Sequence, residues 1–351
     1  MSVVREGRTT IYNSITTQYK LDEVNPDNTQ LEDDFLDYLS STDKSLGTIK
    51  QYRSNLHVFW VWNLEHNKNK FFVDMTKREF AKFQNHAINV WRWSPKRLRV
   101  VKATLSSLSN YIENILDDEY PNFRSIVLKI ESPVNEAVRT KAVYQPDDLK
   151  PLLDELVAEG KYQHACVLAL AMYSGKRKAE LTRFKVHYFD DSNLICGGAL
   201  YKTPEKMVTK GRGRRGKLLD VYILAKPFKP YFDLWMAERE RLGIKSKWLF
   251  PKNRKDENGE DEHIAVTTLD SYAKTFTQKL NKPFYFHAMR HAYTTYLLEQ
   301  NLPENVVQMI QGWASSDMVR IYDDRTGDSQ LEKYFGEGGI KQVEKKSLDD
   351  L

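Results

Sequence analysis

Cysteine is scarce in this chain of 351 residues, and only Cys166 and Cys196 occur. Two cysteines cannot build a disulfide framework or a zinc site made of cysteines, and such low use fits a reducing compartment. No stretch approaches the ~18 consecutive apolar residues of a membrane span, and the N-terminus lacks an apolar segment of signal-peptide length. These absences predict a soluble, intracellular protein of the cytoplasm that has no membrane contact.

A strong excess of one charge is also missing. The chain has 53 Lys and Arg residues against 48 Asp and Glu residues, so its net charge is only +5. Overall basicity is therefore a weak argument for nucleic-acid binding, and the placement of the positive charges matters more. Hydrophobic residues make up 41% of the chain, which suffices for a core in each of the two domains that this length favours.

The first part of the chain has the pattern of a helical domain. Residues 1–26 are polar without a sustained period, which predicts a flexible arm. Apolar residues then recur at helical spacing, so we expect residues 27–120 to form an all-helical domain. Prolines and polar residues in 121–142 interrupt the helical pattern and indicate a linker.

The second part combines helical and strand signals. Residues 143–327 contain several apolar stretches at helical spacing, together with a segment at 197–222 that has glycines, β-branched residues and a basic run. That segment is typical of a strand-turn-strand element. The predicted fold class is therefore α+β and mostly helical, with a small β-sheet or hairpin in the second domain. Residues 328–351 are expected to form a C-terminal tail.

Side chains suited to phosphoryl transfer occur in three separated segments. Arg177 lies in one segment, His287 and Arg290 lie one helical turn apart in another, and Trp313 precedes Tyr322 by nine positions. A DNA phosphodiester resists attack because its anionic oxygens repel nucleophiles and its leaving alkoxide is poor. A metal-free enzyme needs cations on the phosphate, a proton donor and an internal nucleophile. Arginine suits the first task because its planar fork bonds two phosphate oxygens.

Each of these residues also has an ordinary structural interpretation. Arg177 is equally suited to a surface ion pair with Glu180, three residues further on. His287 fits a helix start, and Tyr322 is one of 19 tyrosines, most of which should pack in cores or interfaces. His291 is expected to pack or to orient its neighbours. The signals gain force only when they are taken together, and no set of metal ligands competes with them.

The order and spacing of these segments resemble the tyrosine site-specific recombinases, the integrase family. Ser-Gly-Lys-Arg-Lys-Ala-Glu-Leu at 174–181 is similar to the family's first box, Thr-Gly-x-Arg-x-x-Glu-Leu, and His-Ala-Met-Arg-His at 287–291 to its second, His-x-x-Arg-His. The resemblance covers residues 141–330, and the helical domain is more loosely similar to the family's core-binding domain. Three residues depart from the pattern: Trp313 replaces the commoner histidine, Lys176 an apolar residue, and Gln311 a leucine.

The resemblance implies a recombinase that cuts and rejoins DNA through a 3′-phosphotyrosyl link, without metal, cofactor or ATP. Tyr322 would be the nucleophile, and Arg177 and Arg290 would hold the phosphate. His287 would handle protons and Trp313 would support the phosphate. Supporting roles fall to Glu180 and His291. The family's catalytic lysine, which protonates the leaving 5′ oxygen, corresponds best to Lys210, with Lys202 as the alternative.

Two basic segments are candidates for contact with double-stranded DNA, mainly through its phosphates. One lies on the predicted helix that begins at residue 95, and the other in the 197–222 segment; their members are Lys96, Arg97, Arg99, Lys102, Arg212, Arg214 and Arg215. The ordinary alternative is a solvated charged face. The resemblance further implies a tetramer on paired DNA sites at the nucleoid, in which the tail docks on a neighbouring protomer. A tail folded back on its own domain is the alternative.

Two other functions stay open. A type IB-like topoisomerase would use the same chemistry without choosing a site, and a catalytically silent, sequence-specific DNA-binding regulator would keep only the binding. Retention of every box argues against the silent regulator. A metal-dependent nuclease is disfavoured because no cluster of carboxylates accompanies the boxes.

Overall fold

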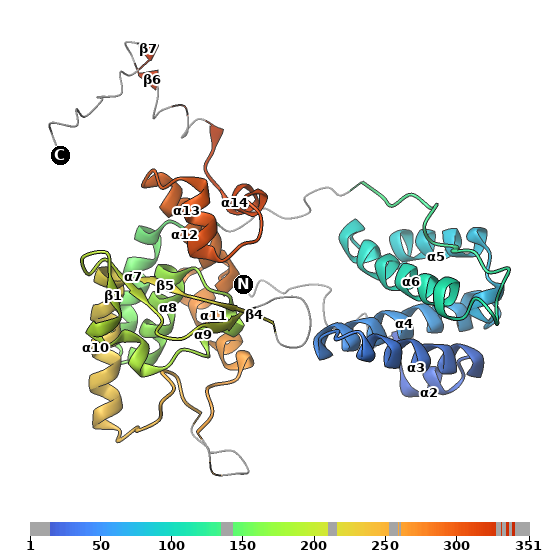
Figure 1. Ribbon diagram of the computed structural model, residues 1–351, viewed down its shortest axis with the longest axis horizontal. Helices are drawn as coiled ribbons and strands as arrows, with labels where there is room; N and C mark the ends of the chain where they lie inside the picture. Colours follow the sequence, from blue (N-terminus) through green and yellow to red (C-terminus); the bar gives the residue numbers. More distant parts are fainter. Residues whose placement is uncertain are drawn as a thin grey trace. The chain divides into compact units, whose positions relative to one another are not determined.

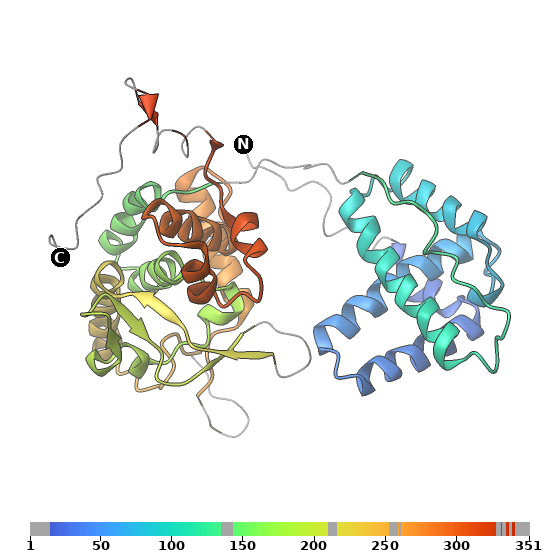
Figure 2. The same cartoon turned by 45° about the horizontal axis from the view of Figure 1, so that its top comes forward.

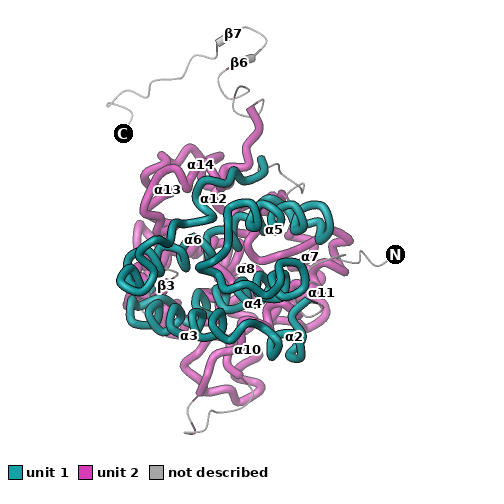
Figure 3. Tube along the Cα trace, turned by 90° about the vertical axis from the view of Figure 1, so that its right-hand side faces the viewer, with its two compact units in different colours: residues 1–140, 211–216 teal, residues 141–210, 217–351 magenta. Residues whose placement is uncertain are grey.

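The computed structural model describes residues 15–134, 143–209, 216–252 and 261–327, and in addition residues 259, 331, 335–336 and 339–340. The chain divides near residue 140 into two compact units, which are drawn in different colours in Figure 3. Each unit contains its own cluster of buried hydrophobic side chains. Among the described helices, none is both long and apolar enough to cross a membrane.

Helices are the regular secondary structure of the first unit in its described residues (Figure 1). Its helices are α2 (Gln18–Asp22), α3 (Pro26–Ser41), α4 (Leu46–His66), α5 (Lys77–Asn89) and α6 (Pro95–Ile115), with a 3-10 turn η1 (Phe72–Asp74). Side chains of Asn25, Ser45, Thr76 and Ser94 accept backbone N–H groups at the starts of α3 to α6, which satisfies donors that the helices leave unpaired. The sequence therefore specifies where four of these helices begin.

Order in the first unit extends beyond the expected range of 27–120 at both ends. Helix α2 lies inside the 1–26 segment, where Ile15 and Val24 are buried. On the other side, Phe123 and Val127 belong to the same core, within the expected linker 121–142. These apolar side chains are too few and too unevenly spaced to produce a helical period, so their pattern predicts irregular segments.

The second unit contains eight helices in its described part (Figure 2). They are α7 (Pro146–Ala158), α8 (Tyr162–Ser174), α9 (Lys178–Leu181), α10 (Ala225–Arg241), α11 (Val266–Leu280), α12 (Phe286–Glu299), α13 (Glu304–Gln311) and α14 (Asp317–Tyr322), with 3-10 turns η2 (Val186–Phe189) and η3 (Asp191–Asn193). Helix α8 is buried along most of its length and contacts α7, α10 and α12. It is the central element of this unit.

Strands in the second unit are short and antiparallel. A sheet in the order β1-β2-β5 joins Leu194–Ile195, Leu200–Lys202 and Tyr222–Leu224. Strands β3 (Met207–Thr209) and β4 (Lys217–Leu219) pair separately, with Thr209 opposite Lys217. A further pair, β6 (Phe335–Gly336) and β7 (Gly339–Ile340), lies in the tail. The predicted fold class, mostly helical with a small sheet and hairpin, is confirmed, although the 197–222 segment contains β2, β3, β4 and the start of β5 rather than two strands.

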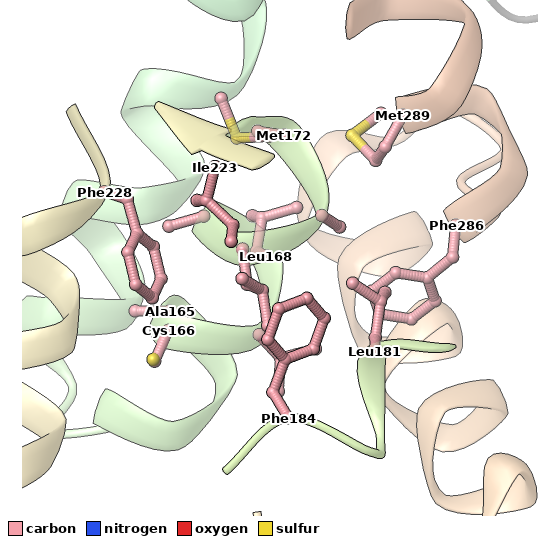
Figure 4. Close-up of a cluster of buried hydrophobic side chains, with 14 of the residues drawn as sticks. Ala165, Cys166, Leu168, Met172, Leu181, Phe184, Ile223, Phe228, Phe286 and Met289 are labelled. Atoms are coloured by element: carbon pink, nitrogen blue, oxygen red, sulfur yellow. The ribbon is translucent and has the colours of Figure 1, made fainter. Parts of the chain in front are cut away.

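The core around α8 fixes the two elements that carry the boxes. Figure 4 shows Leu168 of α8 beside Ile223 of β5 and Phe184, with Phe286 and Met289 of α12 facing the same cluster. All five side chains are almost completely buried. Because interiors are close-packed, α12 has little freedom to rotate or slide, and residues on its other face are held in place.

Two glycines shape the turns next to the boxes. Gly175 ends α8 at φ +59°, and a Cβ there would lie 2.5 Å from Cδ1 of Tyr293, so only glycine fits this left-handed and crowded position. Gly312 ends α13 at φ +70°, and a Cβ there would meet Leu219 of β4 at 2.4 Å. The β3–β4 hairpin therefore contacts the turn that precedes Trp313.

Candidate active site

Tyr322 is enclosed by side chains of the second box and by Trp313. It ends α14 and is 7% exposed. Its hydroxyl oxygen lies 3.0 Å from Nε2 of His287, and its ring lies between Trp313 and His291, with centroid distances of 4.9 and 4.4 Å. The Thr295 hydroxyl donates to the Tyr322 carbonyl, so both main chain and side chain are attached to α12.

Arg290 lies beneath this aromatic group and is completely buried. Its guanidinium carbon is 4.8 Å from the ring centroid of Trp313 and 5.7 Å from that of Tyr322. Two of its N–H groups donate to backbone carbonyls, of Gly175 at 2.9 Å and of Gln311 at 3.0 Å. Burial and the nearby charge of Arg177 lower the pKa of Arg290 to about 10, so it stays a cation at neutral pH.

Two buried donors in this group have no acceptor. Neither the Nε–H of Arg290 nor the indole N–H of Trp313 has a hydrogen-bond partner among the described residues. Buried polar groups are nearly always paired in folded proteins, so unpaired donors beside a cation indicate a place for an anion. Histidine, cysteine, aspartate and glutamate do not gather in groups that could hold a metal ion anywhere in the described part of the chain.

Arg177 is oriented by Glu180, as the spacing predicts. It is the N-cap of α9 rather than a residue of its first turn. The Glu180 carboxylate accepts from the Arg177 guanidinium at 3.0 Å and from the Arg177 backbone N–H at 2.9 Å. Burial acts to raise the pKa of Glu180, but these bonds and the charge of Arg177 outweigh it and lower that pKa. The Glu180 carboxylate is therefore ionised at neutral pH.

Lys176 belongs to the site, although the sequence identified it only as a lysine in place of the apolar residue that is usual in the first box. It is 3% exposed, and its amine donates to the carbonyl of Ile310 at 2.9 Å. Burial, with the charges of Arg290 and Arg177, lowers its pKa to about 7. That replacement, directly before Arg177, was the feature of the sequence that could have indicated a role for Lys176.

His291 supports Tyr322 rather than contacting its hydroxyl. Its ring packs on the Tyr322 ring, and Nδ1 lies 3.1 Å from Oδ2 of Asp324, a contact that is close enough for an ion pair but outside hydrogen-bond angles. The Asp324 backbone N–H also bonds to Thr295. The segment after α14 is therefore attached to α12 at several points.

The arrangement gathers the predicted residues from α12, the α13–α14 turn and the start of α9 in one place. The Phage integrase family matches residues 143–327 of the chain. The chain is a tyrosine recombinase of this family. The family's N-terminal SAM-like domain matches residues 31–122. The family that the two boxes predicted is confirmed, and the protein is a recombinase enzyme.

The recombinase has relatives that match along most of its length. It is 27% identical over 328 residues to the SPbeta prophage-derived recombinase-like protein YomM of Bacillus subtilis, covering 91% of this chain and 94% of that protein. It is 26% identical over 302 residues to the tyrosine recombinase XerD of Listeria innocua, covering 83% and 93%.

Solved structures share the fold at lower identity. A XerH site-specific recombinase bound to palindromic difH substrate matches with a TM-score of 0.62 at 17% identity, covering 91% of this chain and 88% of that one. The Tn1549 transposon integrase in complex with transposon right end DNA matches with a TM-score of 0.60 at 14% identity, covering 87% and 98%.

The structure does not place every predicted site residue of the recombinase in this group. Lys210, Arg212, Arg214 and Arg215 lie outside the described residues, between strands β3 and β4. The alternative lysine, Lys202, lies on β2, where its amine is 3.6 Å from the carboxylate of Asp220. Among the described residues, Lys202 makes no ion pair or hydrogen bond with Tyr322, His287, Arg290 or Trp313.

The four basic residues predicted on α6 differ in exposure. Lys96 and Arg99 are exposed, and Arg99 donates to the carbonyl of Pro133. Arg97 is half-buried over the Trp93 ring. Lys102 is buried, and its amine donates to the Ile130 carbonyl instead of facing solvent. The basic face of α6 is therefore narrower than the sequence predicted.

Proposed function

We propose that this recombinase acts on chosen DNA sites and that Tyr322 forms a 3′-phosphotyrosyl link with the cut strand. The proposal rests chiefly on Tyr322, whose hydroxyl oxygen lies 3.0 Å from Nε2 of His287 and whose ring packs beside Arg290 and Trp313. A phenol is a weak nucleophile until it loses its proton, and a histidine within hydrogen-bond distance can accept that proton. The rings of Trp313 and His291 hold the phenol in one orientation.

In the proposed step, the Tyr322 oxygen attacks the scissile phosphorus and the bond to the 5′ oxygen breaks. The leaving oxygen takes a proton, for which Lys210 is our candidate donor. Arg177 and Arg290 hold the non-bridging oxygens, and the unpaired donors of Arg290 and Trp313 support this assignment. The reverse reaction, with a different 5′ hydroxyl, rejoins the strand. Because the phosphotyrosyl link conserves the energy of the broken phosphodiester bond, no nucleotide hydrolysis is needed.

Access to Arg290 requires a local movement. Its side chain has no exposed surface, and the Tyr322 ring covers it at 5.7 Å from the guanidinium carbon. A phosphate that reaches Arg290 must therefore displace the Tyr322 side chain from its place over the guanidinium. The short α14, with six residues, is the element that would shift.

We further propose double-stranded DNA as the partner, with residues 27–120 as the core-type DNA-binding domain and 143–327 as the catalytic domain. Support comes from fold relatives whose structures contain DNA, such as the Tn1549 transposon integrase in complex with transposon right end DNA. Assembly into a tetramer on paired sites and association with the nucleoid belong to the same proposal. Exposed Lys96 and Arg99 are its best-supported phosphate contacts in the first unit.

The test compares covalent adducts on DNA that the protein itself selects. Duplexes bound from a random-sequence pool by the Tyr322→Phe variant identify the site, and nicked copies of that site trap any covalent adduct. We expect the wild-type protein to give an adduct and Tyr322→Phe to bind equally well but to give none. Tyr296→Phe, which removes a tyrosine hydroxyl from α12 instead of α14, is the matched control and should retain the adduct. An adduct that persists in Tyr322→Phe contradicts the proposal, and relaxation of plasmids lacking the site favours a topoisomerase.

A further inference from the structure

The C-terminus of α13 is held by two cations from other elements. The carbonyl of Ile310 accepts from the Lys176 amine at 2.9 Å, and the next carbonyl, of Gln311, accepts from Arg290 at 3.0 Å. The last carbonyls of a helix lack partners within the helix and carry partial negative charge, so cations are favoured there. Gly312 and Trp313 follow directly, and α14 with Tyr322 comes next.

Burial of a lysine at this point needs an explanation. An ammonium group loses hydration when it is buried, and an apolar side chain of similar volume would fill the space without that cost. The charged groups facing Lys176 are Arg290 on α12, with Arg177 and Glu180 at the start of α9, while α13 supplies the Ile310 carbonyl. Lys176, Arg290 and Arg177 carry three positive charges against the one negative charge of Glu180. The excess positive charge is balanced only when an anion binds.

We propose that Lys176 is a positioning residue that ties the end of α13 to the turn between α8 and α9, and so sets Trp313 and Tyr322 relative to Arg177. The proposal rests on the proposed function, because its effect is read through adduct formation by Tyr322. Lys176 contacts no reacting atom in this arrangement. Its amine joins segments 134 positions apart in the sequence.

The protonation state of Lys176 should change how firmly it holds α13. A charged donor makes a stronger bond to a carbonyl than a neutral one, and its charge also raises the positive potential around the two arginines. With its pKa lowered to about 7, chiefly by burial, Lys176 loses its proton as pH rises through the neutral range. A phosphate held by Arg177 and Arg290 favours the charged form, so adduct formation and protonation of Lys176 support each other.

The experiment measures the single-turnover rate of adduct formation from pH 5.5 to pH 9 on the selected, nicked DNA. Lys176→Met removes the charge and keeps the length of the side chain, and we expect its rate to fall at least tenfold at low pH. The ratio of the wild-type rate to the Lys176→Met rate should decrease as pH rises above about 7. His287 and Lys210 are present in both proteins, so their contributions to the pH profile cancel in this ratio. Lys178→Met, at a half-exposed lysine paired with Asp270, is the control and should follow the wild type.

Two further outcomes decide the proposal. A Lys176→Met variant with the wild-type rate and pH profile overturns it. Should that variant fail to fold in a thermal unfolding assay, Lys176→Arg decides instead, because arginine stays charged across this range. The ratio of wild-type to Lys176→Arg rates should then fall above pH 7, and a constant ratio overturns the proposal. Absence of a Tyr322-dependent adduct in the wild type would instead refute the proposed function itself.

Discussion

Glu180 organises the charges around Arg177 although it is almost completely buried. Burial alone would favour its neutral form, but its bonds to the Arg177 backbone and guanidinium keep the pKa of the carboxyl low. It is also the negative charge that faces Lys176 and Arg290. One carboxylate therefore partly balances three cations, and its removal should affect all of them.

Glu180→Gln should destabilise the protein by on the order of 3 kcal/mol at neutral pH, because breaking a buried ion pair leaves charge uncompensated. The folded-state pKa of Glu180 is depressed, so its contribution is present above the ordinary value of 4.5 and is lost as pH falls below it. Urea unfolding at pH 7 and pH 3.5 measures both effects. A difference between wild type and variant that persists undiminished at pH 3.5 would contradict this assignment.

Lys176 should make the stability of the folded protein depend on pH above neutrality. Its pKa is lowered in the folded state from 10.5 to about 7, so the unfolded chain binds more protons between these values. Stability therefore rises with pH in that window, by at most about 1.4 kcal/mol per pH unit. Relative to Lys176→Met, the wild-type protein should gain on the order of 2 kcal/mol between pH 6 and pH 9 in urea unfolding. A parallel response of both proteins argues against a titrating, buried Lys176.

Single residues were predictable where the relation was local. The three-residue spacing from Arg177 to Glu180, and from His287 to Arg290, places side chains on one side of a helical turn whatever the rest of the fold does. The inward direction of Lys176 and the burial of Lys102 depend on distant backbone carbonyls, which no spacing rule reaches. Lys210 stays a prediction, since it lies outside the described residues.

At the scale of elements, the turn between α8 and α9 does the most to assemble the site. Gly175 ends α8, its carbonyl receives Arg290, and the next two residues are Lys176 and Arg177. The turn fits closely against α12 and α13, with side-chain atoms of Tyr293 and Gln311 within 2.6 Å of where a Cβ would lie. A side chain at Gly175 must therefore move either α12 or the turn.

Gly175→Ala should cost more stability than its left-handed backbone alone explains. Gly160 provides the matched control, because it has a similar φ of +70° and a Cβ there would have no neighbouring atom within 4 Å. We expect Gly160→Ala to cost about 1 kcal/mol and Gly175→Ala at least about 2 kcal/mol in urea unfolding. The adduct rate should fall only in Gly175→Ala, since the displaced turn moves the backbone carbonyl at position 175 to which Arg290 donates. Equal losses in both variants would show that the contact with Tyr293 carries no energy.

Elements were predictable in proportion to their length. Helix α6 buries one face over several turns, and its periodic apolar residues predicted a helix that begins at residue 95, as found. Strands of two or three residues are too short to show alternation, so the sequence predicted one strand-turn-strand element where β2, β3, β4 and the start of β5 form. The periodic pattern also missed α2, whose five residues include none that is buried.

At the scale of the whole molecule, the two units of the chain have separate hydrophobic cores. The first unit buries an aromatic cluster that includes Phe59 and Phe83, and the second is built around α8. Length and composition predicted two domains, but only contacts reveal that residues near 15 and 127 belong to the first core. A net charge of +5 gives little general attraction for DNA, so affinity must come from local groups.

Replacing Lys96 and Arg99 together by glutamine should weaken binding to the selected DNA and reduce its dependence on salt. Each lost phosphate contact should lower the slope of log affinity against log salt concentration by about 1. Fluorescence anisotropy between low and moderate salt measures that slope. Lys82→Gln, at an exposed lysine on α5, is the control for general loss of charge. An unchanged slope in the double variant would place the contacts of the first unit elsewhere.

The contact between Gly312 and Leu219 limits how this recombinase can be rebuilt from parts. Loops that join paired strands are attractive units to exchange when chimeras are made between relatives. Here Leu219 of β4 contacts Gly312, the residue just before Trp313. A transplanted β3–β4 hairpin therefore places its own residue 219 against the turn that positions Trp313. A graft that introduces a bulkier residue at 219 should therefore shift the Trp313 indole and slow DNA cleavage, even if the new loop itself is compatible. Chimeras should exchange residues 219 and 312 together.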